Sequence, residues 1–148
     1  MSRFSSPEQS FGFRYGNTFR RVTSQFASRL KPYDITPEQW SVLYCAYKHE
    51  GINQRELSEL AGKDQPTTTR ILDLLHKKGW IERQDDPADR RAYLIHVTPS
   101  AKELIEQTIP IEVQYNDELL QGVTDEQLAV LDQIMNQIKH NLDNMKLQ

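Results

Sequence analysis

Hydroxyl, amide and guanidinium side chains are concentrated in one short segment near the middle of the chain. This segment consists of Gln65, Pro66, Thr67, Thr68, Thr69 and Arg70. Three consecutive threonines are poor helix-interior residues, because branching and the hydroxyl group both restrict them. In the first turn of a helix they would instead offer hydroxyls and methyls to phosphates, base edges and the methyl group of thymine. The alternative interpretation is an ordinary capped helix start whose threonines face solvent.

A second segment with suitable chemistry is Asp89-Arg90-Arg91. A guanidinium group suits a narrow A·T-rich minor groove, whose negative potential attracts it. A carboxylate one or two residues away, such as that of Asp89, can orient a guanidinium through a bidentate bond. The alternative is a solvated turn in which these charges pair locally.

The first segment is expected to begin the second of two short helices, within residues 54–79. A turn, Gly62-Lys63-Asp64-Gln65, joins them. We expect inner faces of Leu57, Leu60 and Ala61 in the first helix and of Ile71, Leu74 and Leu75 in the second. Two such helices joined by a glycine-containing turn are typical of a helix-turn-helix, whose second helix carries the base-contacting residues at its N-terminal end.

The second segment is expected to lie in a β-hairpin. Residues 80–83 and 92–97 are rich in aromatic and β-branched residues, and they flank a polar, proline-containing stretch at 84–91. A hairpin beside a helix-turn-helix is the wing of a winged helix. The two segments therefore predict one DNA-binding unit over residues 35–98.

Capping patterns and apolar periodicity predict the remaining helices. Residues 36–39, 53–56 and 124–127 read as capping boxes, which place helix starts near 37, 54 and 125. Apolar residues spaced by threes and fours indicate amphipathic helices over about 11–30 and 125–145. A further helix is expected from Thr98 to about Leu120, kinked or broken by Pro110.

The predicted fold is therefore mainly α with a small β-hairpin wing. Residues 8–34 and 99–148 form its helical dimerisation region, because long amphipathic helices need a surface to pack on and a second copy supplies one.

Composition excludes several classes of protein. The net charge of the 148 residues is −3, and residues 52–98 hold eight basic and eight acidic residues, so DNA contacts must come from locally clustered arginines. No apolar run reaches the roughly 18–20 residues that span a bilayer, and the N-terminal residues lack the apolar stretch of a secretory signal. With a single cysteine, Cys45, we expect a cytoplasmic protein without membrane contact. No catalytic motif is present, so we do not expect an enzyme.

The stretch 65–98 resembles the MarR (multiple-antibiotic-resistance regulator) family. Residues 69–83 are similar to that family's recognition helix and first wing strand. Residues 86–91, Asp-Pro-Ala-Asp-Arg-Arg, followed by Val97-Thr98, match its wing signature of Asp-x-Arg and then a small aliphatic-Thr pair. The long flanking helices also fit, so the resemblance covers nearly the whole chain. Two positions depart from the family pattern: Leu75 stands where many members have a basic or polar residue, and Pro110 interrupts a helix that is usually continuous.

The resemblance implies a homodimeric transcriptional regulator that binds double-stranded DNA. We expect a repressor of a pseudo-palindromic operator, with Arg91 as the wing arginine, Asp89 as its carboxylate and Arg90 beside them. Members of the family are usually released from DNA by a small aromatic or phenolic ligand. Its expected binding residues here are Phe11, Tyr15, Phe19, Trp40, Tyr44 and Tyr47, although aromatic residues at helical spacing are more often plain core.

Three alternatives compete with this interpretation. A winged helix can serve as a protein–protein interaction module, which the near-neutral middle of the chain favours. A redox-responsive regulator would use Cys45, although a mid-helix thiol among apolar residues is more typical of a core cysteine. A metal site would draw on scattered histidines without paired ligand spacing, so we expect no metal and no cofactor.

Overall fold

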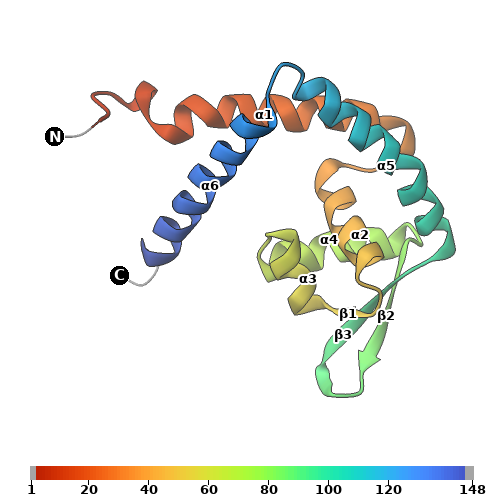
Figure 1. Ribbon diagram of the computed structural model, residues 1–148. Coiled ribbons are helices and arrows are strands. Elements are labelled where there is room, and N and C mark those ends of the chain that lie inside the picture. The colour runs from red at the N-terminus through yellow and green to blue at the C-terminus, as the bar shows by residue number, and fades with distance from the viewer. Residues whose placement is uncertain (1–2, 146–148) are drawn as a thin grey trace. The chain divides into compact units, whose positions relative to one another are not determined.

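The computed structural model describes residues 3–145, and most of these are helical (Figure 1). The helices are α1 (Phe11–Leu30), α2 (Pro37–Lys48), α3 (Gln54–Ala61), α4 (Gln65–Lys77), α5 (Pro99–Leu119) and α6 (Asp125–Met145). The strands are β1 (Ile52–Asn53), β2 (Ile81–Asp86) and β3 (Asp89–Val97). By their contacts, the described residues up to Tyr115 form one compact unit and those from Asn116 form a second. This order of elements confirms the predicted winged helix.

The helix starts agree with the capping patterns. Before α2, the Thr36 hydroxyl accepts from the Gln39 backbone N–H at 3.2 Å, and the Gln39 side chain accepts from the Thr36 backbone N–H at 3.3 Å. Thr124 and Gln127 make the same reciprocal pair before α6. These bonds satisfy backbone donors that the first turn of a helix leaves without partners. The predicted starts at 37 and 125 are therefore confirmed.

The turn between α3 and α4 takes three residues. Gly62 ends α3 with φ at +66°, a left-handed conformation that a residue with a Cβ adopts only at a cost. Asp64 then caps α4, its carboxylate accepting from the Thr67 backbone N–H at 2.7 Å. Helices α3 and α4 pack against each other and against α2.

The strands form an antiparallel sheet in the order β1-β3-β2. Ile81 pairs with Val97, and Ile52 with Ile95, so that apolar residues of all three strands face the core. The hairpin is longer than predicted, because pairing continues through the polar residues 84–86 away from the body of the domain (Figure 1). The two-residue strand β1 was not predicted, since so short a segment has no periodicity.

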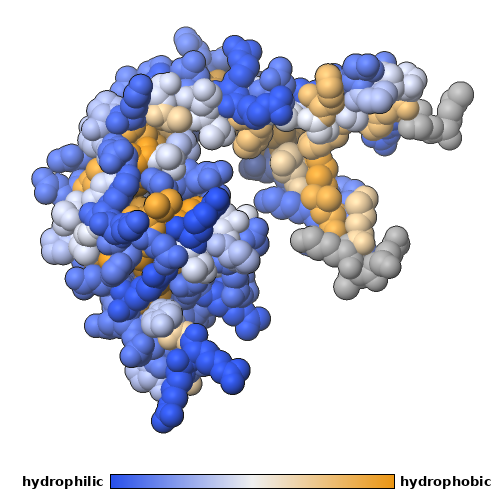
Figure 2. All heavy atoms as spheres, turned by 180° about the vertical axis from the view of Figure 1, so that it is seen from behind, coloured by the Kyte–Doolittle hydropathy of each residue, from blue (hydrophilic) through white to orange (hydrophobic). Residues whose placement is uncertain are grey.

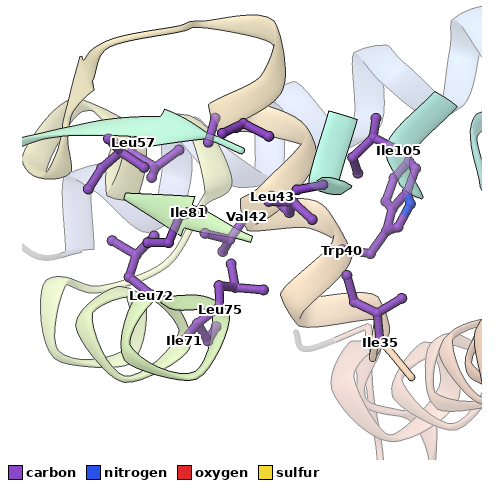
Figure 3. Close-up of a cluster of buried hydrophobic side chains, with 14 of the residues drawn as sticks. Ile35, Trp40, Val42, Leu43, Leu57, Ile71, Leu72, Leu75, Ile81 and Ile105 are labelled. Carbon is purple, nitrogen blue, oxygen red and sulfur yellow. The ribbon is translucent and has the colours of Figure 1, made fainter. Parts of the chain in front are cut away.

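The core lies where α2, α3 and α4 meet the sheet and α5 (Figure 3). Val42 and Leu43 of α2 are fully buried at its centre. The predicted inner faces need two corrections. Leu72 is buried and Leu74 is 41% exposed, and Leu60 is 54% exposed while Leu57 and Ser58 are buried.

The predicted break at Pro110 is wrong, because α5 continues through it. A proline inside a helix removes one backbone hydrogen bond and costs about 3 kcal/mol. Buried residues anchor α5 on both sides of the proline, with Ile105 and Thr108 before it and Tyr115 after it. The Tyr115 hydroxyl also donates to the Val22 carbonyl at 2.6 Å, which ties α5 to α1. Burial and this bond keep the helix continuous. No helix in residues 3–145 combines the length and the apolar character needed to cross a membrane.

Candidate nucleic-acid interface

Helix α4 has one face in the core and one face at the surface. Thr68, Ile71, Leu72 and Leu75 follow the spacing i, i+3, i+4 and i+7 and are buried, which fixes the rotation of the helix about its axis. The predicted contact residues Gln65, Pro66, Thr69 and Arg70 are exposed on the other side. Arg70 makes no ion pair with any residue in the described part of the chain. The exposed face therefore presents amide, methyl and guanidinium groups at the N-terminal half of α4.

The three threonines of α4 differ in their surroundings. Thr67 belongs to the helix cap, and the hydrogen bond from its backbone N–H is the main cause that holds the pKa of the Asp64 carboxyl below its ordinary value. The Thr67 hydroxyl and the charge of Arg70 lower this pKa further. Thr69 is exposed, its hydroxyl donates to the Gln65 carbonyl at 2.9 Å, and it accepts from Gln54 Nε2 at 2.6 Å.

Thr68 requires a correction to the predicted contact list. Its side chain is fully buried, and its hydroxyl donates to the Asp64 carbonyl at 2.9 Å. The reason is the helical register, because Thr68 lies on the same face as Ile71, Leu72 and Leu75. From this position it cannot reach a base edge.

The wing arginines are exposed near the tip of the hairpin. Arg90 and Arg91 are the second and third residues of β3, and within residues 3–145 neither guanidinium makes an ion pair. Asp89 does not hold the Arg91 guanidinium as expected. Its carboxylate accepts from the Arg91 backbone N–H at 2.9 Å instead, which is the local geometry that an aspartate at a turn commonly adopts. Both guanidinium groups are therefore available to an external anion.

Two side-chain links at this surface were not among the predicted site residues. One is the bond from Gln54 to Thr69, which joins α3 to α4. The other joins α4 to the wing, since Arg83 Nη1 of β2 lies 2.7 Å from Asp73 Oδ1. Neither has a local sequence signal, because each depends on how two separate elements pack.

The predicted ligand residues fall into two groups. Trp40 is buried, donates from Nε1 to Thr108 Oγ1 at 2.8 Å, and stacks on Tyr44 with ring centroids 5.2 Å apart. Tyr44 and Tyr47 are half-buried beside it, and the Tyr47 hydroxyl donates to Glu106 Oε1 at 3.5 Å. Trp40 therefore has the surroundings of a core residue, while the two tyrosines remain partly accessible.

The second group lies on α1. Phe11, Tyr15 and Phe19 are 44–68% exposed, as is the nearby Phe13 at 64%. Phe11 and Tyr15 contact each other with ring centroids 4.9 Å apart. No ring contact joins this group to Trp40, Tyr44 and Tyr47 among the described residues. Two surface hollows, of about 620 and 310 Å³, are lined by other residues.

The surroundings of Cys45 do not favour a redox-responsive regulator. The side chain is half-buried in α2, and burial raises the pKa of its thiol. A raised pKa lowers the fraction of thiolate, which is the form that oxidants attack. Among residues 3–145, no three His, Cys, Asp or Glu side chains form a group that could hold a metal ion.

The sequence of the chain is similar to those of known DNA-binding regulators. The model of the MarR family matches residues 35–93. The uncharacterized HTH-type transcriptional regulator YsmB of Bacillus subtilis (strain 168) is 31% identical over 116 residues, which cover 76% of this chain and 77% of that protein.

Solved structures of other proteins share the fold, among them the following two. The S. aureus MepR–DNA complex superposes with a TM-score of 0.82 at 23% identity, covering 93% of this chain and 99% of that one. Bordetella bronchiseptica BpsR, whose DNA binding is regulated by 6-hydroxynicotinic acid, has a TM-score of 0.83 at 18% identity, covering 92% and 97%. At these identities, the likeness is one of fold.

Proposed function

The chain belongs to the MarR family of transcriptional regulators, and from this premise we propose that it is a homodimeric repressor of a pseudo-palindromic operator, released by a small aromatic ligand. The observation that carries DNA binding is the exposed face of α4. Its polar residues stand outward because four buried residues on the opposite face fix the helix in the core. The MepR–DNA complex supports the proposal, since a protein of this fold binds duplex DNA.

The DNA contacts divide between α4 and the wing. Gln65, Pro66, Thr69 and Arg70 enter the major groove, where Arg70 reads guanine or contacts a phosphate. Thr67 lies at the cap, near the backbone N–H groups that favour an anion at a helix N-terminus. Arg90 and Arg91 enter the flanking minor groove. Binding to the DNA backbone depends on a few individual arginines, because residues 52–98 carry equal numbers of basic and acidic residues and so have no net positive charge.

The exposed apolar faces of α1 and α6 pack against a second copy of the chain. No residue of α6 is buried in the single chain. Its exposed side chains include large apolar ones, which are 49–65% exposed: Leu131, Ile134, Leu142 and Met145. Figure 2 shows apolar atoms running along this helix. Helix α1 buries only Leu30 of its twenty residues. Apolar helix faces of this length gain free energy when they are removed from water. We therefore propose that residues 8–34 and 99–148 form the dimerisation region.

The ligand binds between the dimerisation helices and the DNA-binding unit. Tyr44 and Tyr47 are partly accessible on α2, and Phe11, Tyr15 and Phe19 on α1 add aromatic surface for stacking. The regulation of BpsR by 6-hydroxynicotinic acid supports a small aromatic acid as the class of ligand. Such a ligand changes the spacing of the two DNA-binding units without touching DNA, and so weakens binding to both half-sites.

The test is an unbiased selection of duplexes by the full-length protein, followed by affinity measurements over a range of salt concentrations. We expect a recovered motif with two inverted half-sites about 10 base pairs apart, centre to centre. The affinity should fall with salt at a log–log slope of about −0.9 for each phosphate neutralised. A panel of aromatic acids should then release the complex. Recovery of no motif, with no duplex affinity at any salt concentration, would favour a protein–protein module instead.

A further inference from the structure

Gln54, the first residue of α3, reaches the exposed face of α4. Its Nε2 donates to Thr69 Oγ1 at 2.6 Å across a separation of 15 residues in sequence. Asn53 caps α3 just before it by accepting from the Glu56 backbone N–H at 2.8 Å. The buried Ser58 donates its hydroxyl to the Gln54 carbonyl at 3.0 Å. The backbone of Gln54 is therefore held in place where α3 meets α4.

The bond from Gln54 leaves the Thr69 hydroxyl with one free hydrogen-bonding position. A threonine hydroxyl has one donor and two acceptor positions. Thr69 donates to the Gln65 carbonyl at 2.9 Å and accepts from Gln54. What remains is a single acceptor position on an exposed side chain. Thr69 in this state cannot donate to a phosphate or to an acceptor on a base.

Major-groove chemistry then decides which base pair suits Thr69. Guanine presents only acceptors, N7 and O6, whereas adenine N6 and cytosine N4 present donors. An A·T pair offers both a donor, on adenine, and a methyl group, on thymine. The free acceptor position and the methyl group of Thr69 match these two features together. A G·C pair offers at most the donor.

We propose that Gln54 is a specificity-determining residue that acts through Thr69 and makes it read an A·T base pair. This inference rests on the proposed function, since it needs α4 in the major groove. Gln54 is a positioning residue in this scheme. Its amide bond fixes the Thr69 side chain in the orientation in which the hydroxyl donates to the Gln65 carbonyl, and so keeps that hydroxyl from turning to donate to guanine.

The experiment compares four full-length proteins: the unmodified chain, Gln54→Leu, Thr69→Val and the double variant. Each selects its motif from random duplexes, and the affinities for the best duplex and its A·T-to-G·C substitutions are measured. We expect Gln54→Leu to lower the preference for A·T about fivefold at one position of each half-site, the size of one lost hydrogen bond. Thr69→Val should change the same position, because it removes the acceptor. Gln54→Leu should have no further effect on that preference in the Thr69→Val background.

The control is Glu38→Leu, which places a leucine at an exposed position of α2 outside both the proposed DNA contacts and the dimerisation region. It should leave the motif unchanged, and thermal unfolding should show that all variants fold. Equal weakening on all duplexes by Gln54→Leu, persisting in the Thr69→Val background, would make Gln54 a phosphate contact and overturn the inference. That outcome would leave the proposed function standing. Failure of the unmodified chain to select any motif would instead remove the proposed function.

Discussion

Asp73 of α4 and Arg83 of β2 form an ion pair, with 2.7 Å between Oδ1 and Nη1, that connects the recognition helix to the wing. The Asp73 side chain is 60% exposed, while that of Arg83 is 21% exposed. Asp73 lies seven residues after Pro66, so it is two helical turns further along the same side of α4. If α4 binds DNA as proposed, Arg83 neutralises a carboxylate that would otherwise repel the phosphates.

Replacing Arg83 by Gln should weaken DNA binding about tenfold, because Asp73 then carries an unpaired negative charge near the phosphates. Asp73→Asn should weaken binding less, since it removes that charge. The double variant should bind more tightly than Arg83→Gln alone. Fluorescence anisotropy with a labelled operator measures all three, and strictly additive losses would show that the pair has no coupled role in binding.

The wing arginines give a prediction about salt. Arg91→Ala should weaken operator binding and reduce the log–log salt slope by about one, because one phosphate contact is lost. Arg20→Ala is the matched control, since Arg20 is also exposed but lies on α1. It should leave the slope unchanged. Equal slopes for Arg91→Ala and the unmodified chain would remove the wing from the mechanism.

Thr68 and Thr69 should respond differently to the same substitution. Thr68→Val should cost about 1 kcal/mol of folding free energy, because it removes the buried hydroxyl bonded to the Asp64 carbonyl. It should not change which bases are preferred. Thr69→Val should change base preference with little effect on stability. Urea denaturation and duplex selection separate the two effects, and a changed motif in Thr68→Val would contradict the buried placement.

Local signals in the sequence were sufficient for the helix starts and the wing. A capping box such as Thr36-x-x-Gln39 satisfies its own backbone groups, so it predicts a helix start without knowledge of the rest of the fold. Local signals did not distinguish Leu72 from Leu74 as the buried residue, and the prediction of Leu74 was wrong. Both fit an amphipathic helix, and only packing against Val42, Leu43 and the sheet decides between them.

The residues that organise the candidate site could not be predicted in this way. Gln54 and Thr69 belong to different helices, and Asp73 and Arg83 belong to a helix and a strand. Their side chains meet only after the α3–α4 turn and the sheet have formed. The predicted bond from Asp89 to the Arg91 guanidinium is wrong, because the nearer Arg91 backbone N–H donates to the Asp89 carboxylate instead.

The cap of α4 gives a prediction about pH. The folded-state pKa of Asp64 is lowered, chiefly by the bond from the Thr67 backbone N–H. This stabilisation is fully present above the unfolded pKa of about 3.9 and is lost as the pH falls through the folded pKa. Asp64→Asn keeps an acceptor for the cap but cannot titrate. Its stability relative to the unmodified chain should therefore rise below about pH 4, as measured by urea unfolding from pH 6 to pH 3. A difference that stays constant over this range would contradict the role of the carboxylate.

The proposed dimer makes the final prediction. Leu131, half-exposed on the apolar side of α6, is expected to be buried against the second copy. Leu131→Glu places a charge in that interface, which should weaken dimerisation at least about a hundredfold, because desolvating an unpaired carboxylate costs several kcal/mol. Gln133→Glu adds the same charge on the opposite side of the helix and serves as the control. Sedimentation equilibrium should show monomers for the first variant and dimers for the second. Since one α4 contacts only one half-site, the monomer should also lose binding to the full operator, whereas an undiminished dimer would exclude this face of α6 from the interface.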